Sequence, residues 1–279
     1  LYIDNIKFDI NDSEIVKTID DTLKCNDELK QLFAIDLLWK HPLNPWMDTI
    51  KKLFKSQNYK IRRAILELTW NNTEILNNNR IINLINYDQE LRPFAIACLG
   101  DRKIKNIEDI LDPYLNSKSI LLQSASSTSI IKHNSKHKIS LSIIKKLLED
   151  KNYNNVLISI GFFIDLGYLI SDKQYNKYLI NGSTELKIEC LKILEKSPRD
   201  TLIDSVINSL STIGIFQQSE KTLLKFKKSS VIEKFNSYLN DSNINDDLKK
   251  GILKTIHQYD IKKVIHLNIL SLDNDQLKI

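Results

Sequence analysis

The sequence predicts an all-α protein, an α-α superhelix built from about eight antiparallel helix pairs. One template of helix-forming residues recurs eight times, at steps of 29 to 35 residues. The 279-residue chain holds only six glycines and five prolines, which favours helices with short turns over strands. In a fold of this kind each unit buries its apolar face against its neighbours, so a long chain needs no single large core.

The template is clearest in residues 86–100 (NYDQELRPFAIACLG). Asp88 can cap a helix, Leu91 begins its apolar stripe and Gly100 ends it. The residues equivalent to Leu91, called the anchors below, are Leu29, Ile61, Leu91, Leu121, Val156, Leu186, Ile215 and Leu248. A potential capping residue precedes each anchor by three or four positions, namely Asn26, Asn58, Asp88, Ser117, Asn152, Ser183, Thr212 and Asn245.

Seven segments between these helices have apolar stripes of their own and are predicted as the partner helices. They are residues 46–55, 80–87, 107–116, 141–150, 173–180, 201–210 and 231–240. The longest step, from Leu121 to Val156, predicts an enlarged surface loop at residues 133–138. The unit around Ile215 is the weakest, because polar residues at 216–221 interrupt its stripe.

Residues 1–25 differ from the repeats and are predicted as a lead-in and a capping helix. Residues 6–10 alternate like a strand, and the spacing of Ile15, Ile19 and Leu23 predicts the helix. We expect residues 26–279 to form a single continuous repeat domain. Since the chain begins without methionine, we expect it to be a segment of a larger protein.

Three cysteines, Cys25, Cys98 and Cys190, lie far apart in the sequence. Cys98 and Cys190 occupy positions where the repeat favours a small apolar residue, which indicates buried free thiols and a reducing compartment. No apolar run approaches the ~20 residues of a membrane span. We therefore expect a monomer without a membrane span, in the cytoplasm or on the cytoplasmic side of a membrane protein.

Residues 91–95 (LRPFA), followed by Leu99 and Gly100, resemble the HEAT repeat, and residues 61–63 and 186–190 are partial matches. The step of about 30 residues is similar to that of the short bacterial units. This resemblance covers about residues 26–265 and implies a HEAT/armadillo-like solenoid with a concave face. Residues 31–68 also resemble the HEAT-like segment attached to bacterial relatives of ATP/ADP translocases, which implies a soluble coupling domain of a nucleotide-transporter-like membrane protein.

Two basic clusters are candidates for contact with an anionic partner. The stretch between Pro113 and Leu148 has six lysines and no acid, and its candidate contacts are Lys136, Lys138, Lys145 and Lys146. Such lysines also keep a helical surface soluble. Arg62 and Arg63 form the second cluster and can point into a groove, where arginine suits carboxylate or phosphate. The alternative is that Arg62, like Arg92, bonds to loop groups of the next repeat.

Two further groups of residues could carry chemistry. His133 and His137 are four residues apart, as in some metal sites, but the stretch around them has no third ligand, and we interpret them as solvated loop histidines. Trp39, Trp46 and Trp70 lie close in sequence, and some DNA glycosylases with HEAT-like repeats use aromatic residues with an acid. The sequence places no such acid beside them, so we interpret the tryptophans as core.

Together these observations predict no catalytic residue, no cofactor and no metal. Phosphate-binding loops, dinucleotide fingerprints, zinc patterns and nucleophile elbows are not found in the sequence. The preferred function is a non-enzymatic protein-interaction scaffold or regulatory module that binds an unknown protein partner. The alternatives are an anion-binding or nucleic-acid-binding solenoid, and the transporter-coupling domain.

Overall fold

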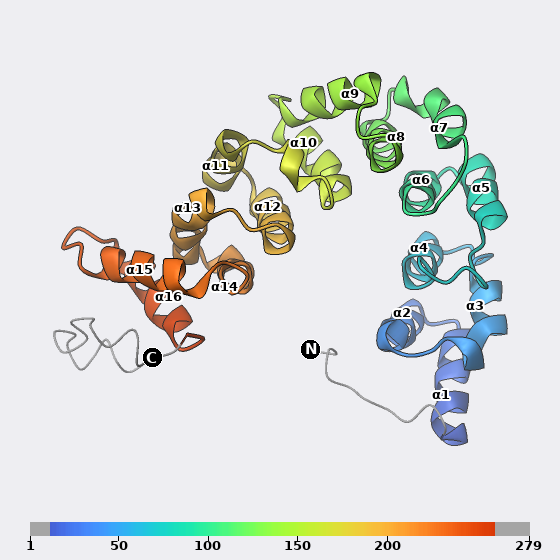
Figure 1. Ribbon diagram of the computed structural model, residues 1–279. Helices are drawn as coiled ribbons and strands as arrows, with labels where there is room; N and C mark the ends of the chain where they lie inside the picture. The colour runs from blue at the N-terminus through green and yellow to red at the C-terminus, as the bar shows by residue number, and fades with distance from the viewer. Residues whose placement is uncertain (1–11, 260–279) are drawn as a thin grey trace. The chain divides into compact units, whose positions relative to one another are not determined.

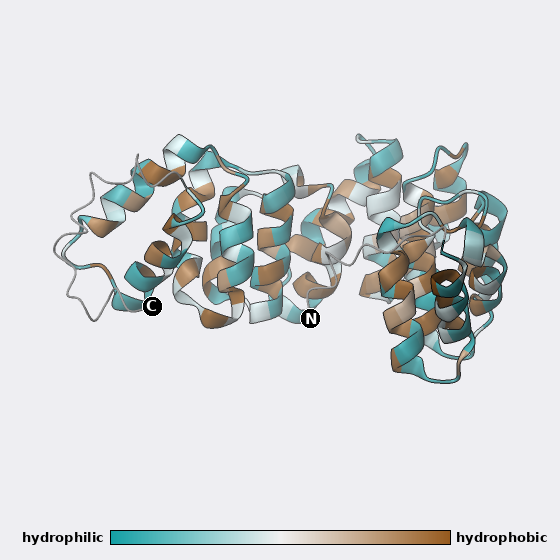
Figure 2. Ribbon diagram, turned by 90° about the horizontal axis from the view of Figure 1, so that it is seen from below, coloured by the Kyte–Doolittle hydropathy of each residue, from teal (hydrophilic) through white to brown (hydrophobic). Residues whose placement is uncertain are grey.

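The computed structural model describes residues 12–259, and this part of the chain is all-helical, with no strand. The predicted fold class is therefore confirmed. Sixteen α-helices follow one another through the described residues, joined by short turns and 3₁₀ segments (Figure 1). Figure 2 shows both hydrophilic and hydrophobic residues along the helices, as expected for helices that bury one stripe.

The chain divides into two compact units, one that extends to Leu141 and one that begins at Ser142. The helices of the first unit are α1 (Ser13–Lys24), α2 (Glu28–Leu37), α3 (Met47–Leu53), α4 (Tyr59–Leu68), α5 (Asn78–Tyr87), α6 (Arg92–Gly100), α7 (Ile107–Leu115) and α8 (Ile120–His133). Helix α9 (Lys138–Leu148) extends across the boundary. Those of the second unit are α10 (Tyr153–Ile160), α11 (Asp172–Asn181), α12 (Thr184–Lys196), α13 (Ile203–Asn208), α14 (Phe216–Leu223), α15 (Lys228–Leu239) and α16 (Asp246–Ile256).

Within each unit the helices form two rows. In the first unit α2, α4, α6 and α8 pack side by side in one row, and each contacts the helix that precedes it in the chain (Figure 1). In the second unit α10, α12 and α14 form one row, and α11, α13 and α15 form the other (Figure 1). The helices that match the predicted partner segments, to within a few residues, are α3, α5, α7, α9, α11, α13 and α15. The prediction that residues 26–279 form one domain stays a prediction.

Helix α1 is the predicted capping helix, and its Ile19 and Leu23 are buried against the first repeat. Asp12 caps it by accepting from the backbone N–H groups of Glu14 and Ile15. The predicted extended lead-in at residues 6–10 lies outside the described residues.

Most of the predicted capping residues occupy their helix starts. Asn58, Asn152, Ser183 and Asn245 each accept from a first-turn N–H group, and Asp88 accepts from Leu91. Three predictions were wrong. Asp27 caps α2 in place of Asn26, and Ser119 caps α8 in place of Ser117. The Thr212 side chain makes no capping bond, because a 3₁₀ turn, Ile213–Ile215, follows it.

Six of the eight anchors are buried, and two predictions were wrong. Leu29 is 77% exposed, because α2 buries its carboxyl half through Ala34, Ile35 and the following Leu38. Leu121 is 36% exposed. Helix α8 instead buries residues 124–131, five of which carry hydroxyl groups, and those of Ser124 and Ser126 donate to carbonyls one turn earlier.

The predicted enlarged loop at residues 133–138 was also wrong. Helix α8 continues to His133, and only four residues separate it from α9. The extra length of this repeat therefore lies in α8, which has 14 residues. The long step between anchors was assigned to a loop at residues 133–138, whereas the extra residues extend the helix.

Helices α6 and α8 approach closely at Gly100 and Ser129. The Ser129 hydroxyl donates to the carbonyl of Ile96 at 2.9 Å, across the two helices. A Cβ added to Gly100 would lie 2.4 Å from Ser129 Oγ and 2.7 Å from its Cα. Gly100 ends α6 as predicted, and the structure gives its reason as close packing, since its φ is not positive.

The weakest predicted unit does form a helix. In α14, Ser219 and Thr222 are buried, and both hydroxyls are hydrogen-bonded. Ser219 donates to the carbonyl of Ile215 at 3.0 Å, and Thr222 bonds to that of Leu191 in α12 at 3.1 Å. Polar residues in this stripe therefore replace apolar packing by hydrogen bonds to neighbouring carbonyls.

Cys98 and Cys190 are buried free thiols, and Cys25 is a partly exposed one. Burial raises the pKa of Cys98 to about 11 and raises that of Cys190 as well. Among the described helices, none has both the length and the apolar content needed to cross a membrane.

Candidate functional site

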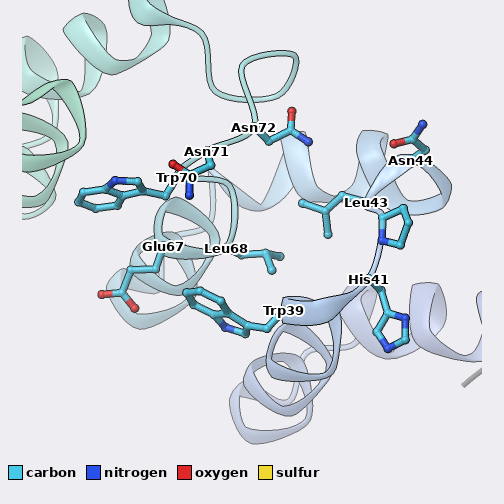
Figure 3. Close-up of a pocket in the computed structure, with 10 residues that line it drawn as sticks. Trp39, His41, Leu43, Asn44, Glu67, Leu68, Trp70, Asn71 and Asn72 are labelled. Atoms are coloured by element: carbon cyan, nitrogen blue, oxygen red, sulfur yellow. The ribbon is translucent and has the colours of Figure 1, made fainter. Parts of the chain in front are cut away.

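A pocket of about 630 Å³ lies in the first unit, where α2 and α4 end side by side. Two stretches line it, one directly after α2 and one that begins in the last turn of α4 (Figure 3). The lining residues are Trp39, His41, Pro42, Leu43, Asn44, Glu67, Leu68, Trp70, Asn71 and Asn72. The pocket is thus formed by two neighbouring repeats and combines aromatic, amide and acidic side chains.

Trp39 is held at the rim by the turn that carries it. A 3₁₀ segment, η2 (Leu38–Lys40), continues α2, and its Leu38 is fully buried. The next side chain therefore points away from the core, and Trp39 is 54% exposed. In Figure 3 its indole extends toward Glu67, while Leu43 extends toward Leu68.

Trp70 is fixed from the opposite side by the next repeat. Its indole N–H donates to Asp101 Oδ2 at 2.7 Å, and Lys132 Nζ donates to Asp101 Oδ1 at 2.6 Å. The carbonyl of Trp70 accepts from the guanidinium of Arg102. Both the ring and the main chain of Trp70 are therefore bonded to the next repeat.

Glu67 is the acidic side chain of the pocket, and it is 37% exposed. Its Oε1 accepts from Arg63 Nε at 2.9 Å. The guanidinium of Arg63 in turn stacks over the ring of Phe94, 4.1 Å from its centroid. Arg63 thereby holds the carboxylate in place through one oxygen. For Oε2 the described residues provide no hydrogen bond comparable to this one.

Of the two predicted groove arginines, Arg62 forms internal contacts. Its side chain is only 12% exposed and pairs with Asp88 at 3.0 Å and Glu90 at 2.6 Å. It also donates to the carbonyls of Ser56 and Gln57. This agrees with the alternative reading of Arg62 as a link between repeats.

Arg92 was predicted to bond to loop groups of the next repeat, and this was wrong. It donates to the carbonyls of Ile85 and Asn86, at the end of the preceding helix, α5. The Arg63 side chain is 43% exposed and borders the pocket through Glu67. Of the predicted groove arginines, Arg63 is therefore the one beside the candidate site.

The four predicted lysine contacts are exposed. Lys136 precedes α9, and the other three lie on it. Lys138 and Lys145 are seven residues apart, which places them on the same side of a helix. Within the described part of the chain no ion pair involves these four side chains, whereas Lys132 is paired with Asp101.

His133 and His137 make separate contacts. His133 Nε2 lies 3.0 Å from the carbonyl oxygen of Gly100, and His137 Nδ1 lies 2.8 Å from Ser140 Oγ at the start of α9. Among the described residues, no group of three or more histidine, cysteine, aspartate or glutamate side chains could hold a metal ion.

The interpretation of all three tryptophans as core was wrong. Trp46 is buried, and its indole N–H donates to the carbonyl of Val16 at 3.0 Å. Trp39 and Trp70 instead line the pocket, and Glu67 is the acid that the sequence had not placed beside them. The repeat spacing was the available signal, because Trp39 and Trp70 are 31 residues apart and so occupy equivalent positions in adjacent repeats.

Comparison with known proteins adds little to this geometry. The sequence matches no family model and no curated protein. Among solved structures, the crystal structure of an engineered protein is similar with a TM-score of 0.33 and 13% identity, over 94% of this chain and 85% of that chain. A similarity at this level supports no inference, so function is argued from the site.

Proposed function

We propose that this chain is a non-enzymatic protein-interaction module made of HEAT-like repeats, and that the pocket between α2 and α4 is where its partner docks. The observation that carries the proposal is Trp39, which is 54% exposed at the rim of the pocket. Tryptophan is enriched among the residues that dominate binding energy at protein interfaces. Exposing so large an apolar ring costs solvation free energy that a docked partner recovers.

The rest of the lining suits a polypeptide. Asn44 and Asn71 are exposed at the rim, and an asparagine side chain offers both a donor and an acceptor to a peptide main chain. Leu43 and Leu68 supply apolar surface beside them. An aromatic and apolar centre with a polar rim is the usual composition of a protein-binding site.

An interaction role also fits the chemistry of the pocket better than catalysis. Of the ten lining residues, Glu67 and His41 are those that could transfer protons, and no serine, threonine, cysteine or lysine lies among them. Glu67 is already held by Arg63. This composition supports binding, and the module can equally serve within a longer protein, including one attached to a membrane transporter.

The proposal is tested by cross-linking from inside the pocket. A photoreactive phenylalanine derivative is placed at position 39 and, as a matched control, at position 87, where Tyr87 is an aromatic side chain 84% exposed and does not line the pocket. We expect position 39, and not position 87, to cross-link a discrete protein in extracts of the source cells. The purified protein should then bind the unmodified chain with a micromolar or lower Kd. Equal cross-linking from both positions, or no binding by the purified protein, would contradict the proposal.

A further inference from the structure

We propose that the pocket recognises a basic side chain, lysine or arginine, presented by the partner protein. This inference rests on the proposed function and specifies the chemistry of the partner. Three features of the described pocket favour a cation, namely the aromatic surface of Trp39, the carboxylate of Glu67, and the carboxyl ends of two helices.

The aromatic surface is the first feature. Tryptophan binds cations over its ring more strongly than tyrosine or phenylalanine does. The rim position of Trp39 leaves more than half of its surface open to a ligand. The same type of contact is already used beside the pocket, where Arg63 stacks on Phe94.

The carboxylate is the second feature. Glu67 Oε1 is occupied by Arg63, and the geometry leaves Oε2 for a second donor. A guanidinium or ammonium group that enters between Trp39 and Glu67 would have a ring and a carboxylate oxygen within reach, since both residues line the same pocket. Hydrogen bonds to a charged carboxylate are about twice as strong as neutral ones.

The helix ends are the third feature. Both α2 and α4 direct their carboxyl ends toward the pocket. The last turn of α4 has no basic residue, whereas η2, which continues α2, ends at Lys40. A helix carries a partial negative charge at that end, so two adjacent ends favour a positive ligand. The same fields disfavour a phosphate, which separates this site from the binding of a nucleic acid backbone.

Other charged groups lie near the pocket and partly offset one another. Arg63 pairs with Glu67, so the pair carries no net charge and Glu67 offers a ligand its second oxygen. Asp36 adds a negative charge in the last turn of α2, whereas Lys40, in η2, and Arg102, at the carbonyl of Trp70, add positive charges. The volume of about 630 Å³ accommodates a long side chain together with adjacent main chain.

The test uses four short peptides that differ at one central residue. Arginine is compared with citrulline, its neutral near-isostere, and lysine with norleucine. The indole N–H signals of the full chain are followed by NMR as each peptide is added. We expect the arginine and lysine peptides to shift the Trp39 signal saturably with a millimolar Kd, and the two neutral peptides to bind at least ~5-fold more weakly.

Variants of the chain assign the effect to the pocket. Glu67→Gln should weaken the arginine peptide by about 3-fold or more, and Trp39→Ala should abolish the selectivity for arginine over citrulline. Asp109→Asn is the matched control, since it removes one negative charge from an exposed position of α7 and should leave all four affinities unchanged.

The outcomes separate this inference from the proposed function. Equal binding of arginine and citrulline peptides, or no effect of Glu67→Gln, would overturn the cation preference. If a partner protein bound through Trp39 with an affinity indifferent to Glu67→Gln, the interaction module would stand and the basic side chain would be excluded. Charge-selective peptide binding that is lost in Trp39→Ala supports the inference even before the partner is identified.

Discussion

At the scale of single residues, Gly100 sets how closely two helices of the first unit can pack. Its Cα faces Ser129, whose hydroxyl donates across the gap to Ile96. A methyl group at position 100 would overlap both the side chain and the backbone of Ser129. The backbone contact matters most, because a side chain can rotate away whereas a packed helix cannot.

We therefore predict that Gly100→Ala destabilises the protein by about 1–3 kcal/mol, the usual cost of overpacking. Gly161→Ala is the control, because nothing lies within 4 Å of its added Cβ and its φ of −60° suits alanine. It should be neutral or stabilising by up to ~1 kcal/mol. Denaturant unfolding of both variants measures the difference, and equal midpoints would contradict the close approach of α6 and α8.

At the scale of elements, one position connects several of the repeats to the next. In the first unit Trp70, Asp101 and Lys132 follow one another at steps of 31 residues and bond in sequence. In the second unit Lys196 pairs with Asp165, again 31 residues apart, at 3.0 Å. Trp39 occupies the equivalent position one repeat before Trp70. Its ring is 54% exposed and lines the pocket.

A second kind of connection joins α11 to the segment after α12. Asp172, in the first turn of α11, accepts from Arg199 at 2.8 Å and from the Thr201 hydroxyl at 2.5 Å. Arg199 also donates to the carbonyls of Gly167 and Ile170. The hydrogen bond from Thr201, then that from Arg199, lowers the pKa of Asp172 below its usual value of 3.8.

This shift predicts how the connection depends on pH. Because the folded pKa is lower than the unfolded one, the stabilisation is complete above about pH 5 and is lost as pH falls through the folded pKa. The difference in melting temperature between wild type and Asp172→Asn should therefore be largest near pH 6 and shrink below pH 4. Thr201→Val should move this loss to higher pH. A difference that stays constant from pH 6 to pH 2.5 would contradict the assignment.

The four exposed lysines on α9 and in the turn before it allow a test of the anion-binding alternative. Charge reversal at Lys136, Lys138, Lys145 and Lys146 should abolish any weak binding to duplex DNA at low salt and leave the melting curve nearly unchanged, since all four are exposed. Fluorescence anisotropy at two salt concentrations measures this. Each phosphate contact contributes a slope of about −0.9 to log K against log salt. Submicromolar binding that persists at physiological salt would favour a nucleic-acid-binding function over the protein-interaction module.

At the scale of the whole molecule, most of the fold could be predicted from the sequence. The step of about 30 residues and the helical spacing of apolar residues located each described helix pair, because both follow from burial against neighbours. One source of error was polar residues in buried positions. Helix α8 buries residues 124–131, of which Ser124 and Ser126 donate to carbonyls one turn earlier, and Leu121 stays partly exposed. In α2 the burial is shifted toward Leu38, which exposes Leu29.

The candidate site could be predicted from the sequence less well than the fold. Aromatic residues at helical spacing are usually core, and only Trp46 followed that rule. Whether Trp39 turns outward depends on the 3₁₀ segment after α2, which no composition signal marks. The approach of Glu67 to Trp39 depends on α2 and α4 lying side by side, which becomes visible only when the repeats are aligned in space.

The central claim is that a protein partner docks on the Trp39 pocket. The most direct test is the equilibrium affinity of the purified partner for wild type, Trp39→Ala and Tyr87→Ala, measured by calorimetry. Both variants remove an exposed aromatic ring from the first unit, and their melting temperatures should agree with that of wild type. We predict a loss of about 30-fold or more for Trp39→Ala, equivalent to about 2 kcal/mol, and no change for Tyr87→Ala. Equal affinities for all three proteins would contradict the account.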